Sequence, residues 1–166
     1  LIQPKFKKKI IDNNKPDLYS IGCAGKITSF NETKDKRIIL VLNGISRFKI
    51  LKEIPINKLY RQCKVEFKDF KEDLIMDNLS IKDSTQNLIF NDFKIFFQKK
   101  GYEIDWKELE KQNLNQAINS LCMIAPFSLE EKQILLETKN INDRKIKIKE
   151  ILNTYILSDI NIKTIQ

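Results

Sequence analysis

The chain contains no histidine, and this absence removes most of the common catalytic chemistry. Without an imidazole there can be no Ser-His or Cys-His nucleophile pair, no HExxH zinc site and no histidine proton shuttle. The three cysteines, Cys23, Cys63 and Cys122, are too few and too scattered for a zinc site made of thiolates alone. We expect free thiols buried among apolar neighbours, as in a reducing compartment.

Glycine is scarce as well. The chain has four glycines, Gly22, Gly25, Gly44 and Gly101. They match neither the GxGxxG nor the GxxxxGKS/T pattern of phosphate-binding loops. Gly22 and Gly25 lie inside a strand pattern, which indicates a bulge or a close backbone crossing rather than a ligand contact.

Acidic residues offer no better candidate for catalysis. The pairs Glu72-Asp73 and Glu130-Glu131 lie among lysines, where a solvated surface or a helix cap is favoured over acid–base chemistry. No motif singles out a Ser–Lys dyad, so a hydrolase is the weakest functional hypothesis. We expect a protein that is not an enzyme, with no catalytic residue, no metal, no cofactor and no small-molecule substrate.

Long apolar runs are absent too. No run approaches the ~18 residues that a membrane-spanning helix needs, and no signal peptide opens the chain. We therefore expect a cytoplasmic protein without a membrane partner. The first residue is Leu1 rather than Met, which favours a fragment whose start lies upstream.

The net charge of +8 leaves nucleic-acid binding open as an alternative. Among the 30 basic residues, however, the only arginines are Arg37, Arg47, Arg61 and Arg144. Arginine is the residue type suited to bidentate contacts with phosphates and bases. Lysines that are spread along the whole chain are more typical of a solvated surface than of a binding stripe.

The first part of the chain has the alternation of apolar and polar side chains that is typical of strands. The apolar run Ile38–Leu42 predicts a strand buried on both faces, and Asn43-Gly44 predicts a tight turn after it. Further alternation surrounds Phe48 and continues in residues 62–67. At least four strands are therefore expected.

From residue 84 onward the apolar period becomes helical. A first helix is predicted by one apolar stripe, formed by Ile89, Phe93, Phe96 and Phe97. Asp105 predicts the start of a second helix that runs to Ala125, where Pro126 ends it. Ser128 and Glu131 form a capping box that opens a short third helix, and one more helix follows.

Strands followed by helices indicate the α+β class. We expect a β subdomain over residues 1–70 and a helical subdomain over residues 71–166. Trp106 lies at the predicted start of the second helix, where a half-buried contact and a partner contact are both open.

Four segments resemble a known family, and one of them, residues 60–66 (YRQCKVE), matches a family strand that ends in Val-Glu. Residues 17–27, DLYSIGCAGKI, resemble an LYxVGxxGxI segment, and residues 39–50, ILVLNGISRFKI, resemble an LLVxGxxRFxI hairpin. Residues 121–133, LCMIAPFSLEEKQ, are similar to a PFxxxEKQxLLE segment. These patterns resemble the N-terminal substrate-binding domain of Lon proteases, in particular its small stand-alone bacterial members. The matching positions, interpreted as structural, are Gly22, Gly25, Gly44, Arg47, Phe48, Pro126, Phe127, Glu131 and Lys132.

The resemblance implies a PUA-like β pseudo-barrel, truncated at its N-terminus, followed by a C-terminal helical subdomain. It also implies a non-catalytic protein- or peptide-binding module that captures unfolded or extended polypeptide. In Lon the unfolding and cleavage belong to separate ATPase and Ser–Lys protease domains, which this sequence lacks. A PUA-like RNA-binding domain is the alternative, because such folds also bind RNA and the chain is basic.

One departure from the family pattern carries a structural expectation. Family members begin with a block of strands and a helix before the segment seen here. Without that block, we expect an exposed edge and an exposed apolar face around Leu1–Phe6 and at the strands near Ile21 and Ile38. Where such patches are seen, we expect them to reflect the missing block before they reflect a function.

Overall fold

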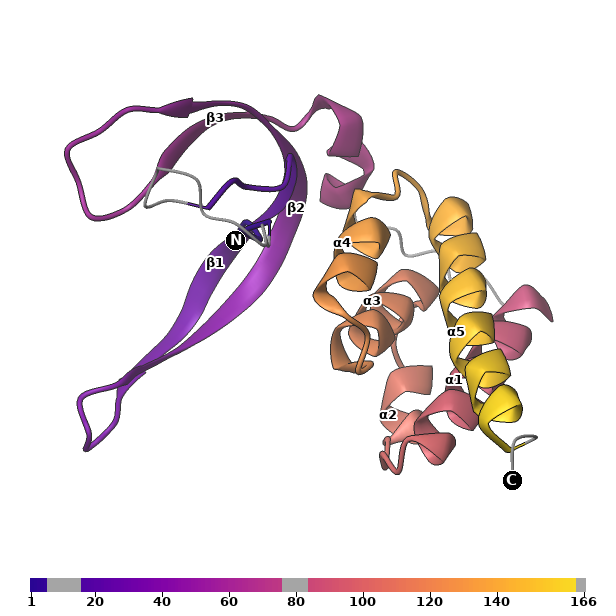
Figure 1. Ribbon diagram of the computed structural model, residues 1–166. Helices are drawn as coiled ribbons and strands as arrows, with labels where there is room; N and C mark the ends of the chain where they lie inside the picture. The colour runs from indigo at the N-terminus through magenta and orange to yellow at the C-terminus, as the bar shows by residue number, and fades with distance from the viewer. Residues whose placement is uncertain (6–15, 76–83, 164–166) are drawn as a thin grey trace. The chain divides into compact units, whose positions relative to one another are not determined.

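The computed structural model describes residues 1–5, 16–75 and 84–163 of the chain. The chain forms two compact units, Leu1–Met76 and Asp77–Gln166. Strands make up most of the first unit and helices make up the second (Figure 1). This is the predicted α+β class. The predicted boundary at residue 70 lies within the 3-10 helix η1 (Lys68–Leu74), which contacts the sheet of the first unit.

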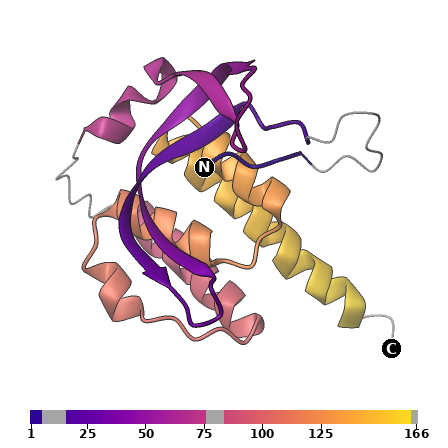
Figure 2. The same cartoon turned by 90° about the vertical axis from the view of Figure 1, so that its left-hand side faces the viewer.

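The described part of the first unit holds one antiparallel sheet with the strand order β1-β2-β3. The strands are β1 (Ile21–Glu32), β2 (Ile38–Ile54) and β3 (Gln62–Glu66). In β3 the alternate residues Cys63 and Val65 are half-buried and their neighbours are exposed, which is the predicted alternation. Figures 1 and 2 show β1 and β2 as a long, curved ribbon that extends well beyond β3.

The prediction of a tight turn at Asn43-Gly44 is wrong, because β2 runs through both residues. In the described part of the chain, φ is positive only at Lys36 and Gly101, so Gly44 does not use the freedom that such a turn requires. The chain reverses at residues 33–37 instead, where the Thr33 N–H donates a hydrogen bond to the carbonyl oxygen of residue 37 (2.8 Å). The two strands predicted before and after Asn43-Gly44 are therefore one strand, β2. The described residues contain three strands rather than four.

Helices form the described part of the second unit. They are α1 (Ser84–Lys99), α2 (Trp106–Glu110), α3 (Leu114–Ile124), α4 (Leu129–Glu137) and α5 (Ile141–Lys163). The prediction of one helix from Asp105 to Ala125 is wrong, because α2 and α3 are separate. The Asn113 side chain accepts a hydrogen bond from the Gln116 N–H (2.9 Å) and so caps a new helix. An asparagine offers the backbone this alternative to a continuous helix.

The core of the second unit is built around aromatic side chains of α1. Phe93, Phe96 and Phe97 are all at most 1% exposed, as the predicted stripe requires. The ring centroid of Phe96 lies 5.4 Å from that of Phe127 and 5.3 Å from that of Tyr155. Aromatic contacts of this kind join α1 to the segment before α4 and to α5.

Replacing Phe96 with alanine should lower the free energy of unfolding of the second unit by about 3–5 kcal/mol, because the change leaves a cavity in the core. The neighbouring Ile95 is 46% exposed, so Ile95→Ala should change the same free energy by less than about 1 kcal/mol. Urea denaturation followed by the fluorescence of Trp106, which contacts Phe97, measures both variants. Equal losses would contradict this assignment of the core.

Candidate functional site

Gly22 is held by close packing. A Cβ atom at this position would lie 2.7 Å from the carbonyl oxygen of Leu1 and 2.7 Å from the Phe48 ring. Phe48 is 6% exposed, and its ring centroid lies 6.0 Å from that of Phe67. A glycine is needed here because two other parts of the first unit occupy the space of a side chain.

Gly25 and Gly44 face each other across β1 and β2, next to a shift in the register. Ile45 is the extra residue of β2 at this shift. A Cβ atom on Gly25 would lie 3.2 Å from the carbonyl oxygen of Asn43. A bulge of this kind bends a strand and increases its twist, so the two glycines shape the ribbon.

Arg47 ties β2 to η1. Its backbone N–H and its Nε donate hydrogen bonds to Oδ2 of Asp73 (2.9 and 2.8 Å), and its Nη2 donates to Oδ1 (2.7 Å). The guanidinium also lies 4.5 Å from the ring centroid of Phe70, which is 2% exposed. Asp73 follows Arg47 by 26 positions in a segment without a clear period, so its role gave no signal in the sequence.

The family segment at residues 121–133 joins helices within the second unit. The Glu131 carboxylate accepts hydrogen bonds from the Ser128 N–H (2.7 Å) and from the Tyr155 hydroxyl (2.8 Å). The predicted capping box of α4 is present and is thereby linked to α5. Lys132 Nζ donates to the carbonyl oxygen of Met123 (2.9 Å), near the end of α3, where a helix leaves carbonyl groups unpaired.

The remaining motif residues and Trp106 also have places in this unit. Pro126 follows the C-cap of α3, and Phe127 is 6% exposed in the aromatic core. Trp106 is half-buried at the start of α2, and its ring centroid lies 6.5 Å from that of Phe90 and 6.1 Å from that of Phe97. Phe127 and Trp106 thus take part in the packing of this unit, whereas the interpretation of the motif as structural and a partner contact at Trp106 both stay predictions.

An exposed apolar surface lies on the far part of the β1–β2 ribbon, residues 25–44, which we call the arm. Antiparallel partners point to the same side of a sheet, so the register places Leu40 beside Phe30 and Leu42 beside Ile27. We define the arm face by five side chains on that side: Ile27, Phe30, Ile38, Leu40 and Leu42. Each of them is between 36% and 61% exposed.

The prediction that Ile38–Leu42 is buried on both faces is wrong. On the side opposite the arm face, Ile39 and Val41 are 55% and 48% exposed. The pairing of β2 with β3 stops at Lys49, so within the described residues this part of β2 has β1 alone as its neighbour. The exposed face near Ile38 agrees with the other expectation from the sequence. Phe6, part of the same expectation, lies outside the described residues.

The outer edge of β1 is open along the arm. At Cys23 this edge is occupied, because the Cys23 N–H donates to the Leu1 carbonyl oxygen (3.0 Å) and the Leu1 amine donates to the Cys23 carbonyl oxygen (2.7 Å). From Ala24 to Glu32, no strand among the described residues pairs with that edge. Such an edge presents unpaired backbone donors and acceptors to any extended chain.

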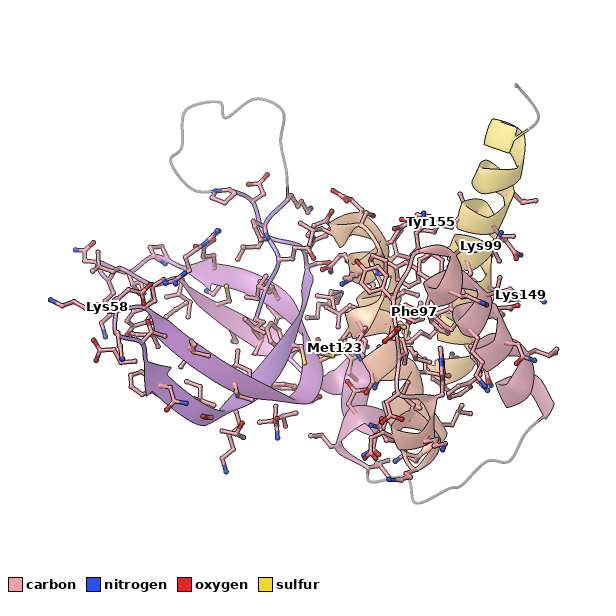
Figure 3. The ribbon with its side chains drawn as sticks, turned by 90° about the horizontal axis from the view of Figure 1, so that it is seen from below. Lys58, Phe97, Lys99, Met123, Lys149 and Tyr155 are labelled. Carbon is pink, nitrogen blue, oxygen red and sulfur yellow. The ribbon has the colours of Figure 1, made fainter. Side chains whose placement is uncertain are left out.

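All four arginines pair with other groups of the same chain. The carboxylate partners are Asp35 for Arg37, Asp73 for Arg47 and Glu53 for Arg61. Arg144 donates a hydrogen bond to Oδ1 of Asn119 (2.6 Å). Figure 3 shows exposed lysines on both units, with Lys58 on the first unit and Lys99 and Lys149 pointing away from the second. The basic residues therefore do not form one arginine-rich surface.

A shallow hollow of about 530 Å³ lies at the end of β2, lined by residues 53–57, Tyr60 and Arg61. Arg61 donates to both carboxylate oxygens of Glu53 (2.7 and 2.6 Å) and to the carbonyl oxygen of Pro16 (2.7 Å). The two charged groups of the hollow are thus paired with each other, which makes it a poor site for a charged ligand.

Residues 1–5, 16–75 and 84–163 contain acidic side chains, helices and three thiols. No cluster of three or more histidine, cysteine, aspartate or glutamate side chains there could hold a metal ion. No helix in those ranges combines the length and apolarity needed to cross a membrane. Cys23, Cys63 and Cys122 are free and only partly buried, rather than buried as expected. Burial nevertheless raises the pKa of the Cys122 thiol to about 12.

Known proteins resemble the chain in both sequence and fold. The family model of the ATP-dependent protease La (LON) substrate-binding domain matches residues 2–154. Lon protease 1 of Borreliella burgdorferi is 24% identical over 161 residues, which cover 96% of this chain and 19% of that protein. Lon protease of Karelsulcia muelleri is 30% identical over 143 residues, which cover 82% of this chain and 16% of that protein. The chain spans less than a fifth of the length of these two relatives.

A solved structure supports the fold. The crystal structure of a Lon N-terminal domain protein from Xanthomonas campestris matches with a TM-score of 0.55. The match covers 86% of this chain and 71% of that one, at 14% sequence identity. At this identity the likeness establishes the architecture and leaves function to be argued from the surface.

Replacing Arg47 with lysine should lower the free energy of opening at the β2 amides by about 1–3 kcal/mol, because lysine cannot form the paired bonds to Asp73. The Arg37 side chain, which pairs with Asp35, is 82% exposed, so Arg37→Lys should cost less than about 0.5 kcal/mol. Native-state hydrogen exchange measures both. Equal effects would show that Arg47 does not hold η1 to the sheet.

Cys122 should react slowly with iodoacetamide at pH 8 in the folded protein. With a pKa of about 12, roughly one thiol in ten thousand is ionised at that pH, and the thiolate is the reactive form. Mass spectrometry of the peptides after timed labelling gives the rate, and labelling in urea gives the rate of the exposed thiol. Similar rates in both conditions would contradict the protection by burial.

Proposed function

This chain belongs to the ATP-dependent protease La (LON) substrate-binding domain family, and on that premise we propose that it binds extended or unfolded polypeptide without catalysing a reaction. The arm face is the surface that we assign to this binding. Family membership supports a substrate-binding role, and the exposed apolar side chains of the arm supply a surface suited to a polypeptide.

The observation that carries the proposal is the exposure of Phe30, Leu40 and their neighbours on one side of a two-stranded ribbon. Five apolar side chains at least 36% exposed lie together there. Covering a leucine or phenylalanine side chain contributes about 1.5–3 kcal/mol. A few such contacts are enough for reversible binding of a short segment.

RNA binding is the second candidate, and the charge distribution weighs against it. Sequence-tolerant RNA binding combines a basic groove with exposed aromatic rings. Here Arg37, Arg47 and Arg61 are paired with carboxylates, and the exposed lysines are distributed over both units. Polypeptide is therefore the better-supported partner.

Leu40→Gln should weaken the binding of an extended peptide by about tenfold, because it removes an apolar contact from the centre of the arm face. The matched control is Ile39→Gln. Ile39 is 55% exposed on the opposite side of the same strand, so its replacement should change the dissociation constant by less than about twofold. Fluorescence anisotropy with a labelled peptide of alternating isoleucine and threonine measures both.

Equal effects of the two substitutions, or no binding of the peptide at all, would contradict the assignment to the arm face. Circular dichroism of both variants checks that the sheet is retained. A labelled oligouridine serves as the RNA probe. Tighter binding of that probe than of the peptide, with a steep loss of affinity as salt rises, would favour the second candidate.

A further inference from the structure

We propose that the bound polypeptide adds a strand to the outer edge of β1 from Ala24 to Glu32, and that it is an apolar segment with acidic rather than basic neighbours. This inference rests on the proposed function and states how the arm binds and which class of segment it selects. Strand addition draws affinity from backbone hydrogen bonds and selectivity from alternate side chains.

Strand β1 already carries a neighbour on this edge. Cys23 directs both of its backbone groups outward, to the Leu1 carbonyl oxygen (3.0 Å) and the Leu1 amine (2.7 Å). In an antiparallel ladder the outward orientation returns at every second residue. Beyond Cys23 the outward positions continue along the same edge, and the extra residue Thr28 shifts their alternation by one residue, so an added strand extends an existing ladder across this bulge.

The side chains of β1 determine which segment fits. Thr28 is the extra residue at the register shift between Ile27 and Ser29, which places Ile27 and Phe30 on the same side of the ribbon. These two side chains are 56% and 61% exposed. They would be the direct cross-strand neighbours of an added strand, so apolar residues at alternate positions of that strand would cover them.

The charged residues of the arm further restrict which polypeptide segments would bind. From Ala24 to Leu42 the chain carries the basic residues Lys26, Lys34, Lys36 and Arg37 and the acidic residues Glu32 and Asp35. Asp35 and Arg37 form an ion pair with each other (2.6 Å). The lysines then outnumber the remaining glutamate, so the arm attracts a segment flanked by acidic residues and repels a basic one.

Two N-methylated forms of one peptide test the strand addition without altering the protein. The parent peptide alternates isoleucine and threonine over about ten residues, with glutamates at both ends. Methylating the amides of the isoleucines or of the threonines removes donors from one edge of the extended peptide only. In fluorescence anisotropy with the intact chain, one form should bind at least about tenfold more weakly than the parent, and the other within about threefold.

Three other outcomes would overturn the inference. Equal affinity of the two methylated forms would exclude strand addition, while binding of the parent peptide would leave the proposed function standing. Failure of the parent to bind would remove the proposed function itself. A concentration-dependent dimer in sedimentation that excludes the parent peptide would assign the edge to a second copy of the chain.

The charge selectivity has a separate test. Exchanging the terminal glutamates of the parent for lysines should weaken binding by about threefold or more at low salt, and the difference should shrink at high salt. Lys34→Gln should reduce this preference, whereas Lys149→Gln in the second unit should leave it unchanged. A lysine-flanked peptide that binds as tightly as the parent would exclude the acidic class.

Discussion

The length of strand β2 is the constraint on which the first unit and its candidate site depend. One part of β2 pairs with both β1 and β3, and the part before Lys49 pairs with β1 alone. The bulge at Gly25 and Gly44 lets the strand bend without ending. Arg47, next to this bend, anchors the strand to η1 through Asp73. Had the chain turned at Asn43, no arm would exist.

An arm made of two strands alone has two exposed faces and one open edge. A two-stranded ribbon gains little stability by itself and needs a third strand or a packed face. A partner that covered the side chains of the arm face, such as Phe30 and Leu40, would remove apolar surface from water, which is favourable. A strand added beside β1 would supply both missing elements, since it would satisfy the backbone edge and cover Ile27 and Phe30.

Features that depend on neighbouring residues could be predicted from the sequence. Contacts between residues far apart in the sequence could not. The capping box of Ser128 and the aromatic stripe of α1 depend on residues within two helical turns, and both were predicted correctly. The partner of Arg47 is 26 positions away, so no local pattern identifies Asp73. The run Ile38–Leu42 has the composition of a buried strand, but burial depends on which other strands lie beside it. The apolar run at Ile38–Leu42 therefore predicted a buried strand, whereas the comparison with the family pattern predicted an exposed face there.

Hydrogen exchange on the intact chain, with and without the isoleucine–threonine peptide, tests whether the arm is the binding site for polypeptide. We expect slower exchange of β1 amides between Ala24 and Glu32 when the peptide is bound, because open backbone donors become paired. Residues 53–61, around the hollow, should be unaffected. Protection at the hollow, or unchanged exchange along β1 while the peptide is bound, would contradict the assignment of the arm as the binding site.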